Sequence, residues 1–323
     1  MSLPYAAMKR RTLLSLPLAA MLPGTARAQS FPTRPITIHV GYVAGSVDAA
    51  VRVLAAALTK DLGQPVLVVN QPGVSGTLAV TNVAHAPPDG HTLAALPSAW
   101  LRLPHLQKVT YDPLADVTYV IRLNTLPMAI TVAQSAPWNS LPELLEYARA
   151  NPAKVSFGGI GVGSPGHIAV ERLGKAAGFK PVYVPFRGSG DLYGGLAGGH
   201  LQVVSEGGFG PFLEAGKIKA LALMEAQRST YWPKVPTARE QGFDVVQTSS
   251  IGIAGPKGLP AAVVQRLHDA FKRAMAQPEF VRVLETYGYP NAYLDSEQYR
   301  AWAIDTFALE KKLVAESGVK LEP

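Results

Sequence analysis

The sequence predicts a two-lobed α/β protein in which each lobe is a mostly parallel sheet flanked by helices. Short runs rich in Val, Ile and Leu alternate with segments of helical periodicity, which is the pattern of βαβ units. Of the 323 residues, the 295 that follow a 28-residue leader exceed what one compact core usually holds. Beyond residue 260 the chain reads as helix alone, so these helices must cover a sheet formed earlier.

The first 28 residues read as a secretory signal peptide. Basic residues at 9–11 precede an apolar run at 13–22, and Ala26-Arg-Ala28 matches an A-x-A cleavage site. A membrane helix needs roughly 20 apolar residues, so this run is too short to be one. We therefore expect cleavage after Ala28 and export to the periplasm. The two arginines within 9–11 leave a twin-arginine signal open as an alternative to an ordinary basic leader.

The first lobe begins with a strand at 36–40 and a helix at 46–62. One face of that helix is apolar, and Gly63 follows it, where a left-handed cap belongs. The remaining elements are expected, in order, as a strand, a helix, a strand and a proline-rich surface loop: 66–69, 77–85, 92–96 and 97–116.

A second set of elements begins at Ser140-Leu-Pro-Glu143, a capping box that opens a helix to Ala150. Ser164-Pro165 opens another helix, which ends at Gly178. Strands are expected at 154–157 and 182–186, and three amphipathic helices close the chain at 261–276, 278–287 and 296–317. We therefore assign 33–131 with 252–323 to the first lobe and 132–251 to the second.

Charge and cysteine content exclude several functional classes. The chain carries 30 Lys and Arg against 23 Asp and Glu, and four of the basic residues lie in the leader, which leaves an excess of three. No basic stripe is interleaved with aromatic residues, so we expect no nucleic-acid partner. The absence of cysteine excludes disulfides and thiolate metal sites, and the histidine spacing supports no other metal site.

Two glycine-rich segments, 41–48 and 158–167, share one design: a strand, a loop of small residues and a hydroxyl residue at a helix start. Small residues let ligand atoms approach the backbone, and the first turn of a helix has unpaired N–H groups and a partial positive charge. Ser46 and Ser164 occupy the two helix starts. Each segment is thus an anion site that needs no Arg or Lys. With one segment in each lobe, we expect a small carboxylate to bind between them.

Enzymatic interpretations fit the second segment less well. Gly161-x-Gly163-x-x-Gly166 matches the dinucleotide fingerprint, but the next strand ends in Arg187, where an acid would hold the ribose. Ser164 lacks the first glycine of a nucleophile elbow and suits a helix cap. We expect no catalytic residue, no cofactor and no metal, while a nucleotide ligand and an enzyme using the same cleft stay open as alternatives.

Several motifs occur in order along nearly the whole chain after the leader: Pro35-Ile-Thr-Ile, Asn70-Gln-Pro-Gly-Val-Ser-Gly76, Ala86-Pro-Pro-Asp-Gly-His-Thr-Leu93, Val184-Pro-Phe-Arg-Gly188 and Ala215-Gly-Lys-Ile-Lys-Ala-Leu-Ala222. This ordered set resembles the extracytoplasmic receptors of tripartite tricarboxylate transporters, the Bug receptors. The resemblance implies a periplasmic-binding-protein (Venus flytrap) fold that holds a ligand carboxylate through backbone groups and ordered water. It also implies membrane permease subunits as partners, and we expect the receptor itself to be a monomer.

Carried over by position, the ligand-binding residues come from the two segments and from the ends of two later strands: Tyr42, Ala44, Gly45, Ser46, Asp48, Gly161, Gly163, Ser164, His167, Arg187, Gly188 and Ser205. Within this set, Asp48 is expected to order the first loop more than to touch the ligand.

The chain departs from the family pattern at three places. Ala44-Gly45-Ser46 stands where the family usually has a longer Pro-Gly-Gly run, and Ser249-Ser250 replaces a common aromatic. Glu206 follows Ser205, and an acid near the cleft disfavours a second ligand carboxylate or favours an amino group. Transport and ligand sensing through a membrane sensor kinase are both compatible with the sequence.

Overall fold

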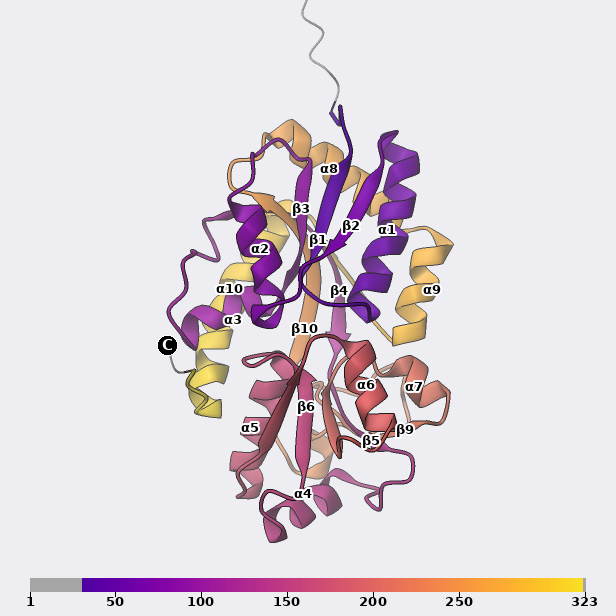
Figure 1. Ribbon diagram of the computed structural model, residues 1–323, viewed down its shortest axis with the longest axis vertical. Coiled ribbons are helices and arrows are strands. Elements are labelled where there is room, and N and C mark those ends of the chain that lie inside the picture. The colour runs from indigo at the N-terminus through magenta and orange to yellow at the C-terminus, as the bar shows by residue number, and fades with distance from the viewer. Residues whose placement is uncertain (1–30, 322–323) are drawn as a thin grey trace, which may run out of the picture. The chain divides into compact units, whose positions relative to one another are not determined.

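The computed structural model describes residues 31–321, which belong to one compact unit built from two sheets flanked by helices (Figure 1). This confirms the predicted α/β class. The leader and its cleavage site lie outside the described residues. Within 31–321, no helix combines the length and the apolar character that a membrane span requires.

The first sheet has six strands in the order β11-β4-β10-β3-β1-β2. Their bounds are, in chain order, β1 Ile36–Val40, β2 Val66–Asn70, β3 Thr92–Pro97, β4 Val117–Pro127, β10 Thr248–Pro256 and β11 Asn291–Leu294. One face packs on α1 (Ser46–Leu62), α8 (Ala261–Met275) and α9 (Pro278–Tyr287). The other face packs on α2 (Thr77–Ala84), α3 (Ala99–Arg102) and α10 (Ser296–Ser317).

The second sheet has five strands in the order β7-β6-β8-β5-β9. These are β5 Ala129–Ala133, β6 Ser156–Ile160, β7 Val182–Phe186, β8 Val203–Glu206 and β9 Ile218–Leu223. Helices α4 (Leu141–Ala150) and α5 (Pro165–Ala177) cover one face, and α6 (Ser189–Ala197) and α7 (Gly210–Glu214) cover the other. Short 3-10 turns occur at Val74–Gly76, Leu103–His105 and Arg239–Gln241.

Both sheets are mixed, with antiparallel strands added to the parallel set that was predicted. In the first sheet β10 pairs antiparallel with both β3 and β4, and in the second β5 pairs antiparallel with both β8 and β9. The prediction used only strands that alternate with helices, and these are indeed parallel. β4 and β5 are separated by Met128 alone, so no helical crossover fixes their direction.

Local signals placed the helices well. The helices predicted at 46–62, 278–287 and 296–317 have those bounds in the structure. α5 begins as expected, because Ser164 Oγ accepts a hydrogen bond from His167 N at 3.2 Å, and it ends at Gly178, whose φ is 74°.

Two expectations about irregular segments were wrong. The segment 97–116 is not only loop, since it contains α3 and the turn that follows it, and the C-terminal block contains the strand β11. Both elements are short and depend on tertiary contacts. Trp100 and Arg102 in α3 are fully buried, and β11 forms by pairing with the edge of β4. A single-sequence pattern does not record such contacts.

The chain crosses between the sheets at Met128 and again just before β10. These two crossings lie side by side, because Met224 N donates to Met128 O at 2.8 Å and Gln247 N donates to Met224 O at 2.9 Å. In Figure 1, β4 and β10 run from the first sheet towards the second. The site described next lies between the same two sheets.

Candidate functional site

A narrow cavity lies between the two sheets and is lined by residues of both. Its volume is about 30 Å³, the space of one or two water molecules. The lining comprises Tyr42, Val43, Gly45, Ser46, Val47, Leu126, Ile160, Pro165, Ser189, Glu206, Gly207, Ser249, Ile251 and Tyr289. A wider cavity of about 420 Å³ adjoins it, and Tyr42 and Ile160 line both.

The N-termini of three helices meet at the narrow cavity. α1 contributes Ser46, α5 contributes Pro165 and α6 contributes Ser189, each the first residue of its helix. Ser46 N donates to Ser189 Oγ at 3.0 Å, which joins the start of α1 to the start of α6. Helix N-termini present unpaired N–H groups and a partial positive charge, so three of them at one cavity favour an anion there.

Asp48 holds the first glycine-rich loop, 41–48, in place through hydrogen bonds. Its Oδ1 accepts from Asn70 Nδ2 at 2.8 Å, and its Oδ2 accepts from Arg52 Nε at 2.8 Å. The same Asn70 amide donates to Tyr42 O at 2.8 Å. These bonds fix the backbone that leads into α1, and Asp48 itself does not line the cavity.

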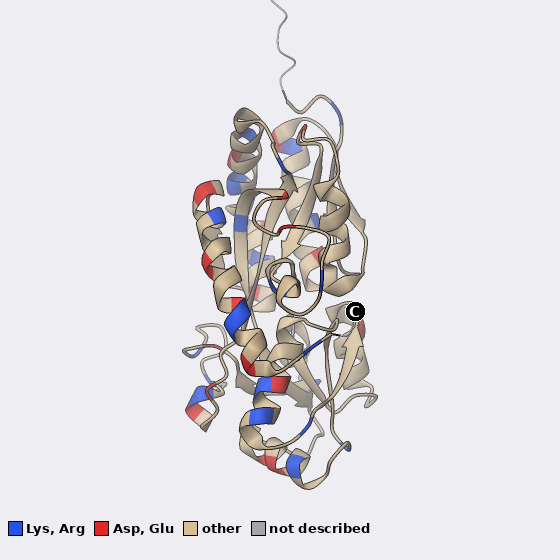
Figure 2. Ribbon diagram, turned by 90° about the vertical axis from the view of Figure 1, so that its left-hand side faces the viewer, with Lys and Arg blue, Asp and Glu red and all other residues tan. Residues whose placement is uncertain are grey.

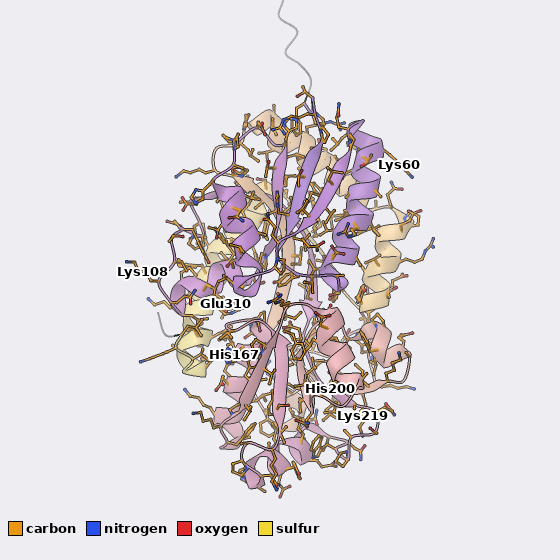
Figure 3. All side chains as sticks on the ribbon, viewed as in Figure 1. Lys60, Lys108, His167, His200, Lys219 and Glu310 are labelled. Carbon is orange, nitrogen blue, oxygen red and sulfur yellow. The ribbon has the colours of Figure 1, made fainter. Side chains whose placement is uncertain are left out.

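The second glycine-rich loop, 158–167, is held in place by hydrogen bonds of its own polar groups. Ser164 Oγ, besides capping α5, lies 3.0 Å from the Tyr183 hydroxyl, which also donates to Gly161 O at 2.9 Å. His167 Nδ1 accepts from Gly163 N at 3.1 Å, and its ring stacks on Tyr183 with centroids 4.1 Å apart. Figure 3 shows His167 at the start of α5. His167 and Ser164 therefore stabilise the loop conformation.

Direct hydrogen bonds link the two halves around the cavity. Ser75 Oγ donates to Val162 O at 2.6 Å, and Arg102 Nη1 donates to Gly163 O at 3.4 Å. Arg102 is fully buried and forms an ion pair with Glu310 of α10, which Figure 3 labels. The second loop thus rests on a buried ion pair that belongs to the first half of the molecule.

Glu206, the last residue of β8, is the one carboxyl among residues 31–321 that lines the narrow cavity. Its side chain accepts from Ile160 N at 3.0 Å through Oε2 and from Gly207 N at 3.3 Å through Oε1. Burial raises the pKa of Glu206 to about 7, although the two backbone N–H groups and Arg102 act in the opposite direction. Tyr289 lies in the same lining, 1 % exposed, and its hydroxyl has no hydrogen-bond partner of acceptable geometry among residues 31–321.

The predicted ligand residues fall into three groups. Tyr42, Gly45 and Ser46 line the narrow cavity, whereas Gly161 and Arg187 line the wider one together with Tyr42. The others line neither and lie in or beside the loops: Ala44, Asp48, Gly163, Ser164, His167, Gly188 and Ser205. Ser205 Oγ, for example, donates to Gly166 O at 3.1 Å.

Sequence reasoning missed Ser189, Tyr289 and the apolar lining. For Ser189 a signal existed, because Gly188-Ser189 follows the strand β7 and opens α6 in the same way as Gly45-Ser46 opens α1. Tyr289 follows α9 in a segment with no motif, and only the packing of that segment under α1 brings it to the cavity.

Two further observations concern metal ions and the distribution of charge. Within it, no three His, Asp or Glu side chains are grouped to hold a metal ion. On the face that Figure 2 shows, acidic and basic residues are interspersed along the helices without a basic stripe.

Comparison with known proteins identifies close structural relatives. The sequence model of the family described as "Tripartite tricarboxylate transporter family receptor" matches residues 50–319. A UPF0065 protein from the gbd 5' region of Cupriavidus necator is 38 % identical over 94 % of both chains. The periplasmic binding protein BugD is 27 % identical, with a TM-score of 0.85 over 90 % of this chain and 100 % of BugD.

Two related structures contain ligands. MatC from Rhodopseudomonas palustris, with bound malate, is 28 % identical, with a TM-score of 0.81 over 88 % of this chain and 100 % of MatC. Rpa4515 from R. palustris, with adipate, is 28 % identical, with a TM-score of 0.83 over 90 % of this chain and 99 % of Rpa4515.

Proposed function

The chain belongs to the receptor family of tripartite tricarboxylate transporters, a family of solute-binding receptors and not of enzymes, and we propose that it captures a small carboxylate between its two sheets. One observation carries the proposal: the N-termini of α1, α5 and α6 converge on a single cavity. Among the described residues, no Lys or Arg lines that cavity, so the helix ends are its source of positive potential. Malate and adipate, bound by the two R. palustris relatives, are both carboxylates, which supports this ligand class.

In the proposed binding mode, the ligand carboxylate is held mainly by backbone N–H groups. Tyr42, Gly45 and Ser46 line the place where it binds, and Gly161 and Arg187 lie along the adjoining cavity. The other predicted residues, Ala44, Asp48, Gly163, Ser164, His167, Gly188 and Ser205, keep the loops in position. This division is supported by the internal hydrogen bonds of Ser164 and His167.

We further propose that two lobes, 33–131 with 252–323 and 132–251, move apart to admit the ligand. A volume of about 30 Å³ is too small for a dicarboxylate, so entry requires such a motion. The adjacent crossings at Met128 and Gln247 are suitable hinge positions, because the chain passes there between the two sheets and the crossings are hydrogen-bonded through Met224.

The family implies an extracytoplasmic location, as for the periplasmic BugD. In this proposal the leader is removed after Ala28 and the mature protein delivers its ligand, as a monomer, to the membrane permease subunits of its transporter. It performs no catalysis and requires no cofactor.

The decisive experiment is calorimetry with matched acids and amides. Malate and adipate are compared with malamide and adipamide, and at least one acid should bind while its amide binds on the order of a hundredfold more weakly, because two charge-assisted hydrogen bonds are lost. Equal affinity for an acid and its amide contradicts a carboxylate site.

Turnover is tested in the same samples. After the protein is denatured, NMR of the recovered acid should show it chemically unchanged. Conversion of the acid would contradict the receptor function.

A further inference from the structure

Glu206 places a hydrogen-bond acceptor at the same cavity as the three helix N-termini. The residue is 6 % exposed, and each carboxylate oxygen accepts one backbone N–H. A carboxylate oxygen has two lone-pair sites, so both oxygens retain accepting capacity. No Lys or Arg in the described chain lines the cavity to neutralise Glu206.

Hydroxyl groups line the same cavity as Glu206. Ser46, Ser189 and Ser249 line the cavity with it, as does Tyr289 with its unpartnered hydroxyl. The backbone after β8 runs close to these groups, since a Cβ on Gly208 would lie 2.8 Å from Ser46 Oγ. The cavity therefore combines donors for an anion with an acidic acceptor.

A ligand whose only polar group is a carboxylate satisfies the helix ends but leaves Glu206 without a partner on the ligand, so it is not the best ligand for this cavity. The helix ends favour a carboxylate, but a second carboxylate beside Glu206 has no hydrogen to donate to it and is repelled once Glu206 is ionised, in a site from which water is largely excluded. An amino or hydroxyl group satisfies Glu206 without that repulsion. Because Glu206 and the first residues of the three helices line one small cavity, the donor must lie close to the bound carboxylate, and the adjacent carbon is the nearest position for it.

We propose that Glu206 selects acids that carry an amino or hydroxyl group on the carbon next to the bound carboxylate. The proposal rests on the carboxylate-receptor function above and names the substrate class of the same site. Glu206 is then a specificity-determining residue that contacts the ligand donor, and Tyr289 supplies a further hydroxyl near the ligand.

The test uses two series of acids that differ only in the group at the second carbon. The first is succinate, malate and aspartate, and the second is butyrate, 2-hydroxybutyrate and 2-aminobutyrate. Calorimetry on the mature protein should show a substituted acid binding roughly tenfold to a hundredfold more tightly than its unsubstituted parent in at least one series. The order of the amino and hydroxyl acids identifies which donor is used.

Variants assign the preference to Glu206. In Glu206→Met, which has no acceptor, the preference should shrink to within about threefold. In Glu206→Gln the amino acids should lose their advantage most, because the negative partner of the ammonium is gone. The second variant keeps the test valid if the methionine protein fails to fold. Glu225→Gln, a half-buried glutamate that lines neither cavity, is the matched control and should keep the wild-type preference.

The outcomes separate this inference from the proposed function. Binding of succinate or butyrate as tightly as their substituted relatives contradicts the donor preference but leaves a carboxylate receptor intact. A full preference retained in both Glu206 variants also contradicts it. Failure of all six acids to bind contradicts the carboxylate function and the inference together.

Discussion

Replacing Glu310 with glutamine tests whether the buried ion pair beneath the second loop stabilises the fold. Arg102 Nε donates to Glu310 Oε2 at 2.7 Å, and Arg102 Nη2 donates to Oε1. The two side chains are 0 % and 4 % exposed, so water cannot replace a lost partner. Removing one partner of such a pair typically costs about 3–5 kcal/mol, because the other charge stays buried and uncompensated. We expect Glu310→Gln to lower the free energy of unfolding by that amount.

Urea unfolding followed by circular dichroism measures the effect, and Arg102→Met, Glu310→Leu and the double variant Arg102→Met/Glu310→Leu form a double-mutant cycle. The double variant should recover much of the loss, since two apolar side chains leave no buried charge. Asp244→Asn is the control, because its pair with Arg239 is largely exposed and should contribute at most about 1 kcal/mol. A loss below about 1 kcal/mol in Glu310→Gln, or a double variant as unstable as both single ones together, refutes the reasoning.

Three further predictions concern the site. The folded protein keeps the proton of Glu206 up to about pH 7, whereas the unfolded chain releases it near 4.5, so the free energy of unfolding should fall by about 3 kcal/mol as pH rises through that interval. Urea titrations at several pH values in this interval should show the fall in the wild-type protein and not in Glu206→Gln. Gly163→Ala should destabilise more than Gly216→Ala in thermal melts, because both have positive φ but only Gly163 has atoms within 4 Å of the new Cβ. Ser189→Ala should strengthen the binding of an acid by roughly fivefold in calorimetry, because Ser189 Oγ no longer competes with the ligand carboxylate for Ser46 N; unchanged affinity would place the ligand elsewhere.

Local chemistry explains which parts of the fold were predictable. α1 and α5 were found because apolar periodicity, a hydroxyl or small residue at the start and a glycine at the end are all recorded within a few residues. The directions of β4 and β10 depend on how the chain passes between sheets, which no local signal encodes. The same holds for α3, whose Trp100 is buried by residues distant in the sequence.

The site residues divide in the same way, into features that local sequence records and features that depend on contacts in the folded chain. Gly45 and Ser46 were predicted because loop composition and helix position together indicate an anion site, and both line the cavity. Ser164 and His167 have the same pattern, but their polar atoms bond within their own loop. Sequence composition shows that polar groups are present at a helix start, and only the structure shows which partners they have.

The contact between Ser46 and Ser189 has a consequence for affinity. Ser189 Oγ accepts the first N–H of α1 at 3.0 Å, and this N–H is one of the donors that a ligand carboxylate requires. A carboxylate must therefore compete with an oxygen that is already in place, and its net gain is the difference between the two hydrogen bonds. Because a charged acceptor forms the stronger bond, an anion displaces the hydroxyl while a neutral amide oxygen gains little. The arrangement adds discrimination for charge at a cavity that no Lys or Arg among residues 31–321 lines.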